Sequence, residues 1–307
     1  MRAIKKILFF ADGAKGEKNA LSQSIALAAH HGASLTVVDV VAEVASNDVR
    51  LDATMKKLQN SLVDERKTAL QAMLEQVDQL SLAGSIEVLV MPGKDYIEII
   101  RAVIKKPFDL LVKSANQHNV LSATLFGDTD LNLMRKCPCP IWIIKPEDKK
   151  TINKVLAAID LTDAPETQQL ACQVVELAAS VAAQESAQLQ IMNAWQPPSM
   201  PHLSTRVEGK EFAKMMVAIK DTSTEQLHTA AAHAAPVTPT EILVDGKPED
   251  AIIGIVDSNK IDLLVMGTMS RGGIPGLLIG NTAEKVLYRV DCSVLTLKPD
   301  GFKSPVE

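Results

Sequence analysis

Short apolar runs alternate along the chain with stretches in which apolar residues recur every three or four positions. The runs have the length of β-strands, and the three- and four-residue spacing is typical of amphipathic helices. We predict ten strands, at residues 6–11, 34–41, 85–90, 108–113, 141–145, 154–159, 187–193, 240–244, 261–266 and 293–298. Helices are expected between them. Phe212, Met215, Met216 and Ile219 mark one helix, and a core-facing stripe explains its methionines better than a ligand-binding role does.

Several predicted strands are apolar at nearly every position, such as residues 109–112 and 262–266. Continuous apolar strands are typical of parallel sheets that helices cover on both faces. The regular alternation of strand and helix therefore predicts an α/β fold, with two open, mostly parallel sheets of five strands that are Rossmann-like.

The sequence also contains an internal repeat. Residues 4–12 match residues 152–160, and residues 108–146 align without a gap on residues 261–299. Identical pairs include Asp109/Asp262, Leu110/Leu263, Leu111/Leu264, Val112/Val265, Gly127/Gly280, Thr129/Thr282 and Cys139/Cys292. The chain is therefore expected to hold two copies of one domain, at residues 1–146 and 151–300, joined by a short charged linker.

Composition narrows the possible functions. The 307 residues suffice for two domains, and 47% are hydrophobic, as in ordinary globular proteins. The net charge of −5 and the lack of a basic block argue against direct binding of nucleic acid. No apolar run approaches the length of a membrane span, and the N-terminal run is too short for a secretory signal. Four cysteines do not form a disulfide framework, so a cytoplasmic setting fits best.

The segment with the most distinctive chemistry is residues 265–287, which follows a predicted strand and opens a predicted helix. Its five glycines allow the backbone to approach a ligand closely. The free N–H groups at a helix start attract anions such as phosphate. The segment is neither a P-loop nor the GxGxxG of dinucleotide-binding folds.

The spacing in this segment resembles a motif of the universal stress protein family. Nucleotide-binding members carry Gly-x2-Gly-x9-Gly-Ser/Thr after the fourth strand, and here Gly267, Ser270 and Gly280-Asn281 keep that spacing. The strand endings at Asp12 and Asp160 are similar to the same family. The resemblance covers nearly the whole chain, once per half, and the chain looks most like the tandem two-domain members.

The resemblance implies a fold like that of the adenine nucleotide alpha hydrolases and a role in bacterial stress resistance, including tolerance of DNA-damaging agents. It implies a regulator or sensor that binds ATP or another adenine nucleotide with magnesium, not a dedicated enzyme. Carried over by position, Asp160 would lie at the adenine end, Met266 and Gly267 would line the adenosine, and Ser270, Gly280, Asn281 and Thr282 would face the phosphates. Arg271 either meets a phosphate or remains solvated.

Two residues depart from the family motif in this half, because Ser270 replaces its second glycine and Asn281 replaces its hydroxyl residue. The first half departs further and keeps only Gly127 of the three glycines. Asp128 stands where Asn281 stands, and a carboxylate there would satisfy the helix start and repel phosphate. We therefore expect the first half not to bind ATP.

Structural explanations remain open for several of these residues. Asn281 and Glu284 have the spacing of a helix capping box, and the two strand-ending aspartates are suited to capping the loops that follow them. Cys137 and Cys139 lack further ligands at zinc-like spacing. Cys139 recurs as Cys292 and reads as a small buried residue, whereas Cys137 has no counterpart and leaves a redox role open.

Two other functions stay open besides the leading one. The first is a ligand-free scaffold in which both sites have decayed. The second is a weak ligase or hydrolase that uses an adenine nucleotide, although no HExxH, GxSxG or other catalytic group stands out. The family pairs its domains through the closing strand. Residues 141–145 and 293–298 are therefore expected to pair within one chain as an internal pseudo-dimer, and further pairing into a homodimer is left open.

Overall fold

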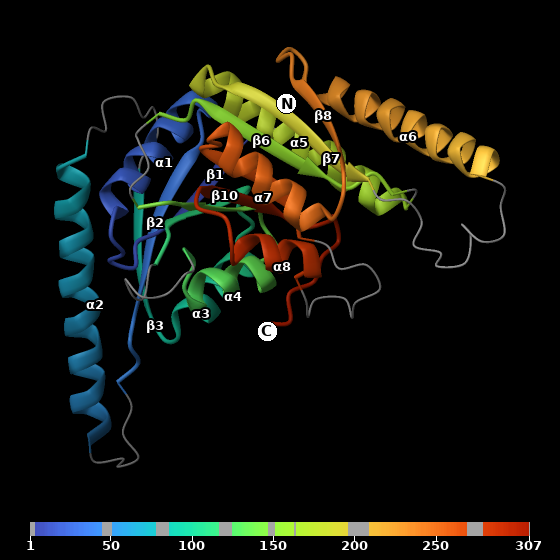
Figure 1. Ribbon diagram of the computed structural model, residues 1–307. Coiled ribbons are helices and arrows are strands. Elements are labelled where there is room, and N and C mark those ends of the chain that lie inside the picture. The colour runs from blue at the N-terminus through green and yellow to red at the C-terminus, as the bar shows by residue number, and fades with distance from the viewer. Residues whose placement is uncertain are drawn as a thin grey trace.

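The computed structural model describes residues 4–44, 51–77, 86–116, 125–146, 151–162, 164–195, 209–268 and 279–306. Its strands and helices alternate in both halves (Figure 1), as the sequence predicts. The first half contains β1 (Lys6–Phe10), α1 (Glu17–His31), β2 (Ser34–Val41), α2 (Asp52–Glu75), β3 (Ile86–Pro92), α3 (Asp95–Lys105), β4 (Leu110–Ser114), α4 (Asp128–Lys136) and β5 (Ile141–Ile144).

The second half repeats this order. It contains β6 (Lys154–Ile159), α5 (Pro165–Glu185), β7 (Gln188–Trp195), α6 (Gly209–Ala231), the short 3-10 helix η2 (Ala232–Ala234), β8 (Thr240–Asp245), α7 (Pro248–Asn259), β9 (Leu263–Gly267), α8 (Asn281–Leu287) and β10 (Ser293–Leu297). All ten predicted strands are present, with bounds that differ by at most two residues at either end.

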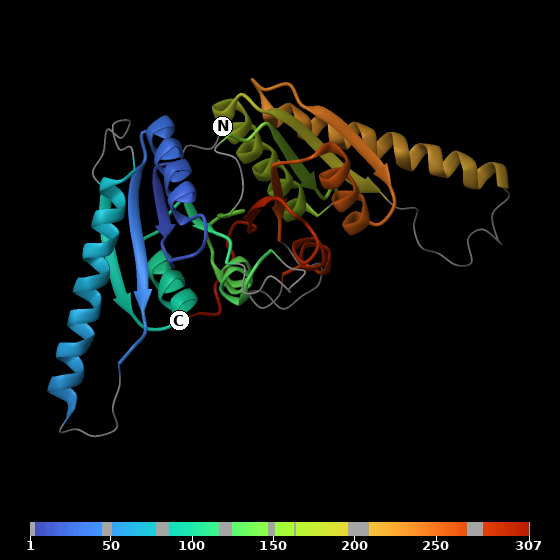
Figure 2. The same cartoon turned by 60° about the vertical axis from the view of Figure 1, so that its left-hand side comes forward.

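The strands form one sheet of ten, in the order β3-β2-β1-β4-β5-β10-β9-β6-β7-β8. Neighbouring strands within each half are parallel. The halves meet where β5 and β10 pair antiparallel, with Trp142 opposite Leu295 (Figure 2). The expected pairing of the two closing strands within one chain is therefore observed, and it makes the two predicted sheets one continuous sheet.

Helices cover both faces of this sheet, because successive strand residues point to opposite sides. Phe9 belongs to a core that also holds residues of α1, α2, α5 and α6, whereas Phe10 belongs to a second core formed with α3, α4, α7 and α8. The central strands are buried along their whole length. Burial of each large aliphatic side chain is worth about 1.5–3 kcal/mol, so these two cores supply the main stabilisation.

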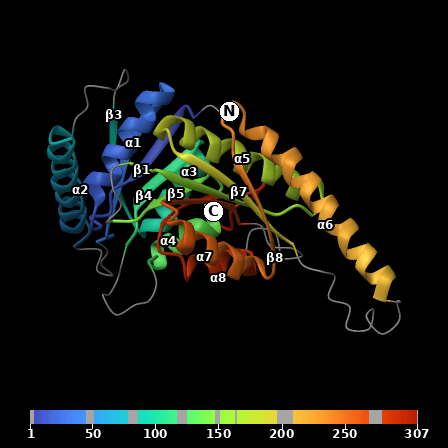
Figure 3. The ribbon, with the colours of Figure 1, turned by 45° about the horizontal axis from the view of Figure 1, so that its top comes forward.

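The prediction of a core-facing stripe on α6 is wrong. Phe212, Met215, Met216 and Ile219 are all half-exposed, and only the end of the helix carries buried residues, Leu227, Ala230 and Ala231. The reason is length, since α6 runs well past the sheet that its last turns cover (Figure 3). Helix α2 does the same at the opposite end of the molecule (Figure 2). Helical spacing identifies an apolar face but does not say whether a partner covers it.

Among the helices that the structure describes, none is long and apolar enough to cross a membrane.

Candidate functional site

A cavity of about 540 Å³ opens at the carboxyl ends of the strands in the second half. This is where open α/β sheets usually bind ligands. Asp160 follows β6, Asn193 lies near the end of β7, and Met266 and Gly267 end β9, so three neighbouring strands form the floor. The start of α8 and the loop before α7 form the sides. The remaining lining residues are Ala158, Ile159, Thr167, Leu170, Ala171, Val174, Met192, Ala194, Lys247, Pro248, Glu249, Ile252, Gly280, Asn281, Thr282, Ala283 and Lys285.

The structure brings together most of the residues singled out in the sequence. Asp160, Met266, Gly267, Gly280, Asn281 and Thr282 all line this one cavity. Ser270 and Arg271 lie outside the described residues. Sequence reasoning missed the contribution of Asn193 and of the lysines at the edge, Lys247 and Lys285, because no motif marks them.

Packing around the cavity explains two of its residues. A Cβ on Gly267 would lie 2.6 Å from Leu170 Cδ2, so a glycine at this position lets α5 close tightly over β9. Asn193 is 6% exposed and donates from Nδ2 to the Ile159 carbonyl at 3.0 Å, which fixes the end of β6 beside Asp160. At the rim, Lys285 Nζ donates to Glu249 Oε1 at 2.7 Å and lowers the pKa of that carboxyl.

The capping box that the spacing of Asn281 and Glu284 left open is not formed. Gly280 takes the N-cap position, and Asn281 is the first helical residue, with an exposed side chain. The Glu284 carboxylate instead accepts a hydrogen bond from Arg135 Nη2 of α4 at 2.5 Å, which links the two halves. The Asn281 side chain is thus not used to cap its own helix.

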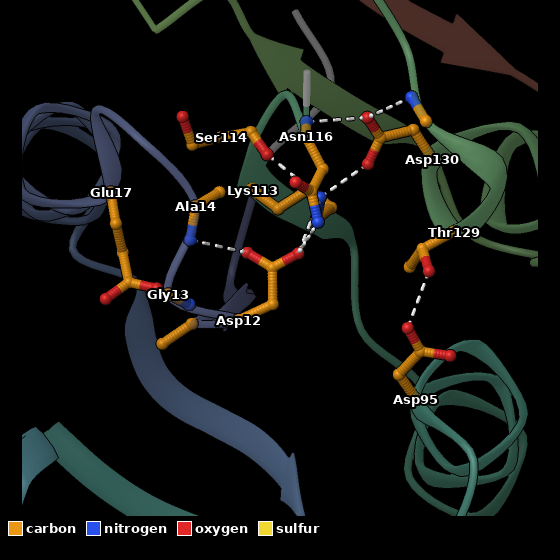
Figure 4. Close-up of polar contacts among 12 residues, drawn as sticks. Asp12, Gly13, Ala14, Glu17, Asp95, Lys113, Ser114, Asn116, Thr129 and Asp130 are labelled. Carbon is orange, nitrogen blue, oxygen red and sulfur yellow. Dashed lines mark hydrogen bonds and ion pairs between the residues drawn. The ribbon is translucent and has the colours of Figure 1, made fainter. Parts of the chain in front are cut away.

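The equivalent position in the first half holds a buried lysine. Lys113 is fully buried at the end of β4, and Met266 lies 153 positions further on, in the ungapped repeat. Lys113 Nζ lies 3.0 Å from Asp12 Oδ2, donates to the Ser114 carbonyl at 2.9 Å, and forms a short ion pair with Asp130 (Figure 4). The alkyl chain and ammonium therefore occupy the space next to the aspartate that ends the first strand.

The opposite charges in this cluster stabilise one another's ionised forms. Burial by itself would lower the pKa of Lys113, but the carboxylates of Asp130 and Asp12 outweigh burial and raise it, so the lysine remains an ammonium. Asp130 Oδ2 also accepts from the backbone N–H of Asn116 at 2.9 Å and of Gly127 at 3.1 Å. The lysine and its two carboxylates are therefore a satisfied buried network.

This finding corrects the explanation given for the first half. Asp128 does begin α4, as predicted, but its side chain is exposed. The carboxylate that satisfies the start of the helix is Asp130, two residues later, because only the third helical position can reach back to the Gly127 N–H.

Two further contacts of charged side chains distinguish the first half from the second. Arg66 of α2 pairs with the buried Asp39 and donates from Nη2 to the Ala11 carbonyl at 3.2 Å. The strand register places Asn193 at the position of Asp39, with the Ile159 carbonyl in place of that of Ala11. An arginine–carboxylate pair in one half is thus replaced by a single neutral amide in the other.

The second contact concerns the hydroxyl that both halves share. Thr129 Oγ1 donates to Asp95 Oδ2 at 2.5 Å. The counterparts in the repeat are Thr282 and Pro248, and proline offers no side-chain acceptor. In the second half the threonine therefore lines the cavity instead of being held by a neighbouring carboxylate.

Comparison with known proteins agrees with this architecture. The sequence profile of the universal stress protein family matches residues 3–145 and again residues 151–298. The chain belongs to the universal stress protein family. It carries the universal stress protein module twice, and the two modules share one continuous sheet.

Curated relatives of this universal stress protein are also of tandem length. It is 28% identical over 262 residues to universal stress protein E of Photorhabdus laumondii, covering 77% of each chain. It is 29% identical over 229 residues to universal stress protein E of Escherichia coli K12, covering 71% of this chain and 70% of the relative.

Solved structures show the same fold over the whole chain. A putative universal stress protein from Pseudomonas aeruginosa UCBPP-PA14 superimposes with a TM-score of 0.72 at 23% identity, covering 98% of this chain and 95% of that one. A universal stress protein from Archaeoglobus fulgidus superimposes with a TM-score of 0.59 at 16% identity, covering 95% and 98%.

Proposed function

We propose that this universal stress protein binds an adenine nucleotide in the cavity of its second half, and that its first half does not. Binding is proposed to change the surface offered to protein partners, so that the protein acts in the cytoplasm as a stress-resistance regulator or sensor, with tolerance of DNA-damaging agents among its outputs. The observation that carries the proposal is the contrast between Met266 and Lys113 at equivalent positions. Met266 lines a cavity, whereas Lys113 is fully buried against two aspartates.

The size and chemistry of the cavity fit such a ligand. A volume of about 540 Å³ lies within the usual range for small-molecule sites, roughly 300–1,000 Å³. Met266, Leu170 and Ile252 offer apolar surface for a base, and Asp160, Asn193 and Thr282 offer polar groups around it. The motif spacing that runs from Gly267 to Gly280 supports the phosphate end of the same proposal.

We propose binding without efficient turnover. Any magnesium would arrive as the counter-ion of the phosphates, since no group of three or more His, Cys, Asp or Glu side chains is placed to hold a metal in the described part of the chain. Hydrolysis of ATP is expected to be slow. A steady-state phosphate-release assay checks this, with Gly280→Val as the control, and robust turnover that this substitution abolishes would favour the enzyme hypothesis.

The decisive experiment places a lysine in the cavity. In Met266→Lys the new ammonium gains Asp160 as a partner, as Lys113 has Asp12, but Ala283 stands where Asp130 supplies the second carboxylate. A melt without nucleotide therefore first checks that the variant is folded. Wild-type protein should melt at a higher temperature with ATP, ADP or AMP plus magnesium, because a ligand at a hundred times its Kd stabilises by about 2.7 kcal/mol. Met266→Lys should lose that shift.

A matched control adds the same charge elsewhere. Val217 is 60% exposed on α6, away from the cavity, and Val217→Lys should keep the full shift. A second variant, Asn281→Asp, places a carboxylate at the start of α8 and should weaken binding in a calorimetric titration. Absence of any nucleotide-dependent shift in the wild type would leave the ligand-free scaffold as the better description.

A further inference from the structure

Two cysteine thiols are in contact between α4 and β5. Cys137 follows α4 directly, and Cys139 precedes β5 by two residues. Their Sγ atoms lie 3.5 Å apart, and both residues are buried, with Cys139 6% exposed. The contact between the two thiols raises the pKa of Cys139 well above its usual value, so Cys139 keeps its proton. This arrangement is a vicinal dithiol, and nucleotide binding makes no use of it.

A buried lysine of the other half lies beside this dithiol. Ile141 pairs with Thr296 across the antiparallel strands, so Lys298 continues β10 toward Cys139 and Cys137. Lys298 is 8% exposed, and its Nζ has no hydrogen-bond partner in the described part of the chain. It lies 4.9 Å from the centre of the Phe302 ring. Burial lowers its pKa to about 8, and the charge of the Cys137 thiolate acts in the opposite direction.

The repeat shows that this environment is specific to one end of the junction. Lys145 is the counterpart of Lys298, and its Nζ lies 2.8 Å from Asp291 Oδ1. The residue at the position of Asp291 in the first half is Pro138. One lysine therefore has a carboxylate partner, whereas the other faces a pair of thiols.

We propose that Cys137 and Cys139 are an oxidative modification site, which hydroperoxides convert to an intrachain disulfide. The Cys137 sulfur attacks one peroxide oxygen, the O–O bond breaks, and the departing oxygen takes up the thiol proton and leaves as water. The Cys139 thiol then attacks the sulfenic acid sulfur and releases a second water. In total, two thiols and one hydrogen peroxide give one disulfide and two waters, so sulfur loses two electrons and peroxide gains them.

The other two cysteines provide internal controls. Cys292 is the counterpart of Cys139, but Val290 stands where Cys137 would be, so the position that supplies the second thiol holds no cysteine in this half. Cys172 lies on α5, outside the Cys137–Cys139 pair, and burial raises its pKa.

The experiment treats the folded full-length protein with hydrogen peroxide and then alkylates the remaining thiols after denaturation. Peptide mass spectrometry is expected to find Cys137 and Cys139 protected together, lighter by two hydrogens, while Cys172 and Cys292 are alkylated. In Cys139→Ser, Cys137 should instead be trapped by dimedone as the sulfenic acid. A dithiol that stays fully alkylatable in excess peroxide, or a Cys292 that oxidises at the same rate, would overturn the proposal.

A second variant tests the lysine. Lys298→Met removes the ammonium and should slow disulfide formation about threefold or more at pH 7, because a nearby ammonium favours the thiolate form of a thiol and the thiolate is the nucleophile. Lys145→Met is the matched control at the other end of the junction and should leave the rate unchanged. Equal rates in the wild type and in Lys298→Met would refute the part assigned to the lysine.

Discussion

The charge cluster of the first half makes a sharp prediction about stability. Lys113→Met puts the residue of the second half into the first and removes the counter-ion of two carboxylates. Asp130 is completely buried, and the Asp12 side chain is 11% exposed. Removing one partner of a buried ion pair costs about 3–5 kcal/mol, because the remaining charge loses its compensation. We expect a loss of that size at pH 7.

The double variant separates a lost ion pair from a misfit side chain. Lys113→Met with Asp130→Ala reproduces the Met266 and Ala283 of the second half, and no unpaired charge remains at position 130. The backbone N–H groups of Asn116 and Gly127 still lose their acceptor, at about 1–3 kcal/mol. The double variant should therefore be more stable than Lys113→Met, although it contains one more substitution.

Urea denaturation followed by circular dichroism measures Lys113→Met, Asp130→Ala and the double variant against the wild type. The coupling between the two positions should exceed about 2 kcal/mol, whereas independent sites add within about 0.5 kcal/mol. Additive losses would refute the claim that the lysine and aspartate stabilise each other. So would a loss below 1 kcal/mol for Lys113→Met alone, since it would mean that the cluster is not a satisfied buried network.

Three other outcomes follow from the structure. Folding lowers the pKa of Lys298 from 10.5 to about 8. Between these two pH values the unfolded chain binds more protons than the folded chain, so the free energy of unfolding rises with pH, by roughly 3 kcal/mol in all. Lys298→Met should be more stable than the wild type at pH 7 in urea melts, with an advantage that shrinks by pH 10, and a constant difference would contradict this. Gly16→Ala should cost about 2–4 kcal/mol, because φ is +80° and a Cβ would lie 2.7 Å from the backbone after β5. Gly13→Ala, with φ +75° and no neighbour within 4 Å, should cost only about 1 kcal/mol, so equal losses in thermal melts would disprove the steric reason. Arg135→Ala should cost less than about 1 kcal/mol, since its pair with Glu284 is 27% and 38% exposed, and a larger loss that persists in 1 M salt would show that more than an exposed ion pair is lost.

Most of the fold could be predicted from the sequence because burial on both faces leaves a simple pattern. The strand at residues 110–114 is apolar at its first three positions, and its counterpart at 263–267 is apolar nearly throughout. Because the pattern occurs twice in the chain, each predicted element is supported by two separate stretches of sequence. Helix α6 was misjudged because the periodicity of Phe212 and Ile219 reports a shared helix face and contains no information about what packs on it.

The candidate site was predictable only in part. The glycine spacing pointed to residues that do line one cavity. The sequence favoured Asp128 as the carboxylate that satisfies the start of α4, whereas the structure shows that it is Asp130. Both are aspartates, and the choice between them depends on how far each side chain can reach. Lys113 did leave a signal in the sequence, because it is a single charged residue in an apolar strand and aligns with Met266 in the repeat. Its meaning depends on two aspartates that are distant in the sequence, and only the fold brings the three together.

The antiparallel contact between β5 and β10 has a consequence for how copies of this protein assemble. The closing strand of each half pairs with that of the other half, so Ile143 and Val294 are buried as soon as the chain folds. A single-module relative would have to recruit a second molecule to shield that border, at a rate set by concentration. Here the partner is tethered, so its high effective concentration favours pairing within the chain over pairing with a different chain. Any larger assembly must therefore be built from the outer margins of the sheet at β3 and β8, or from the helices.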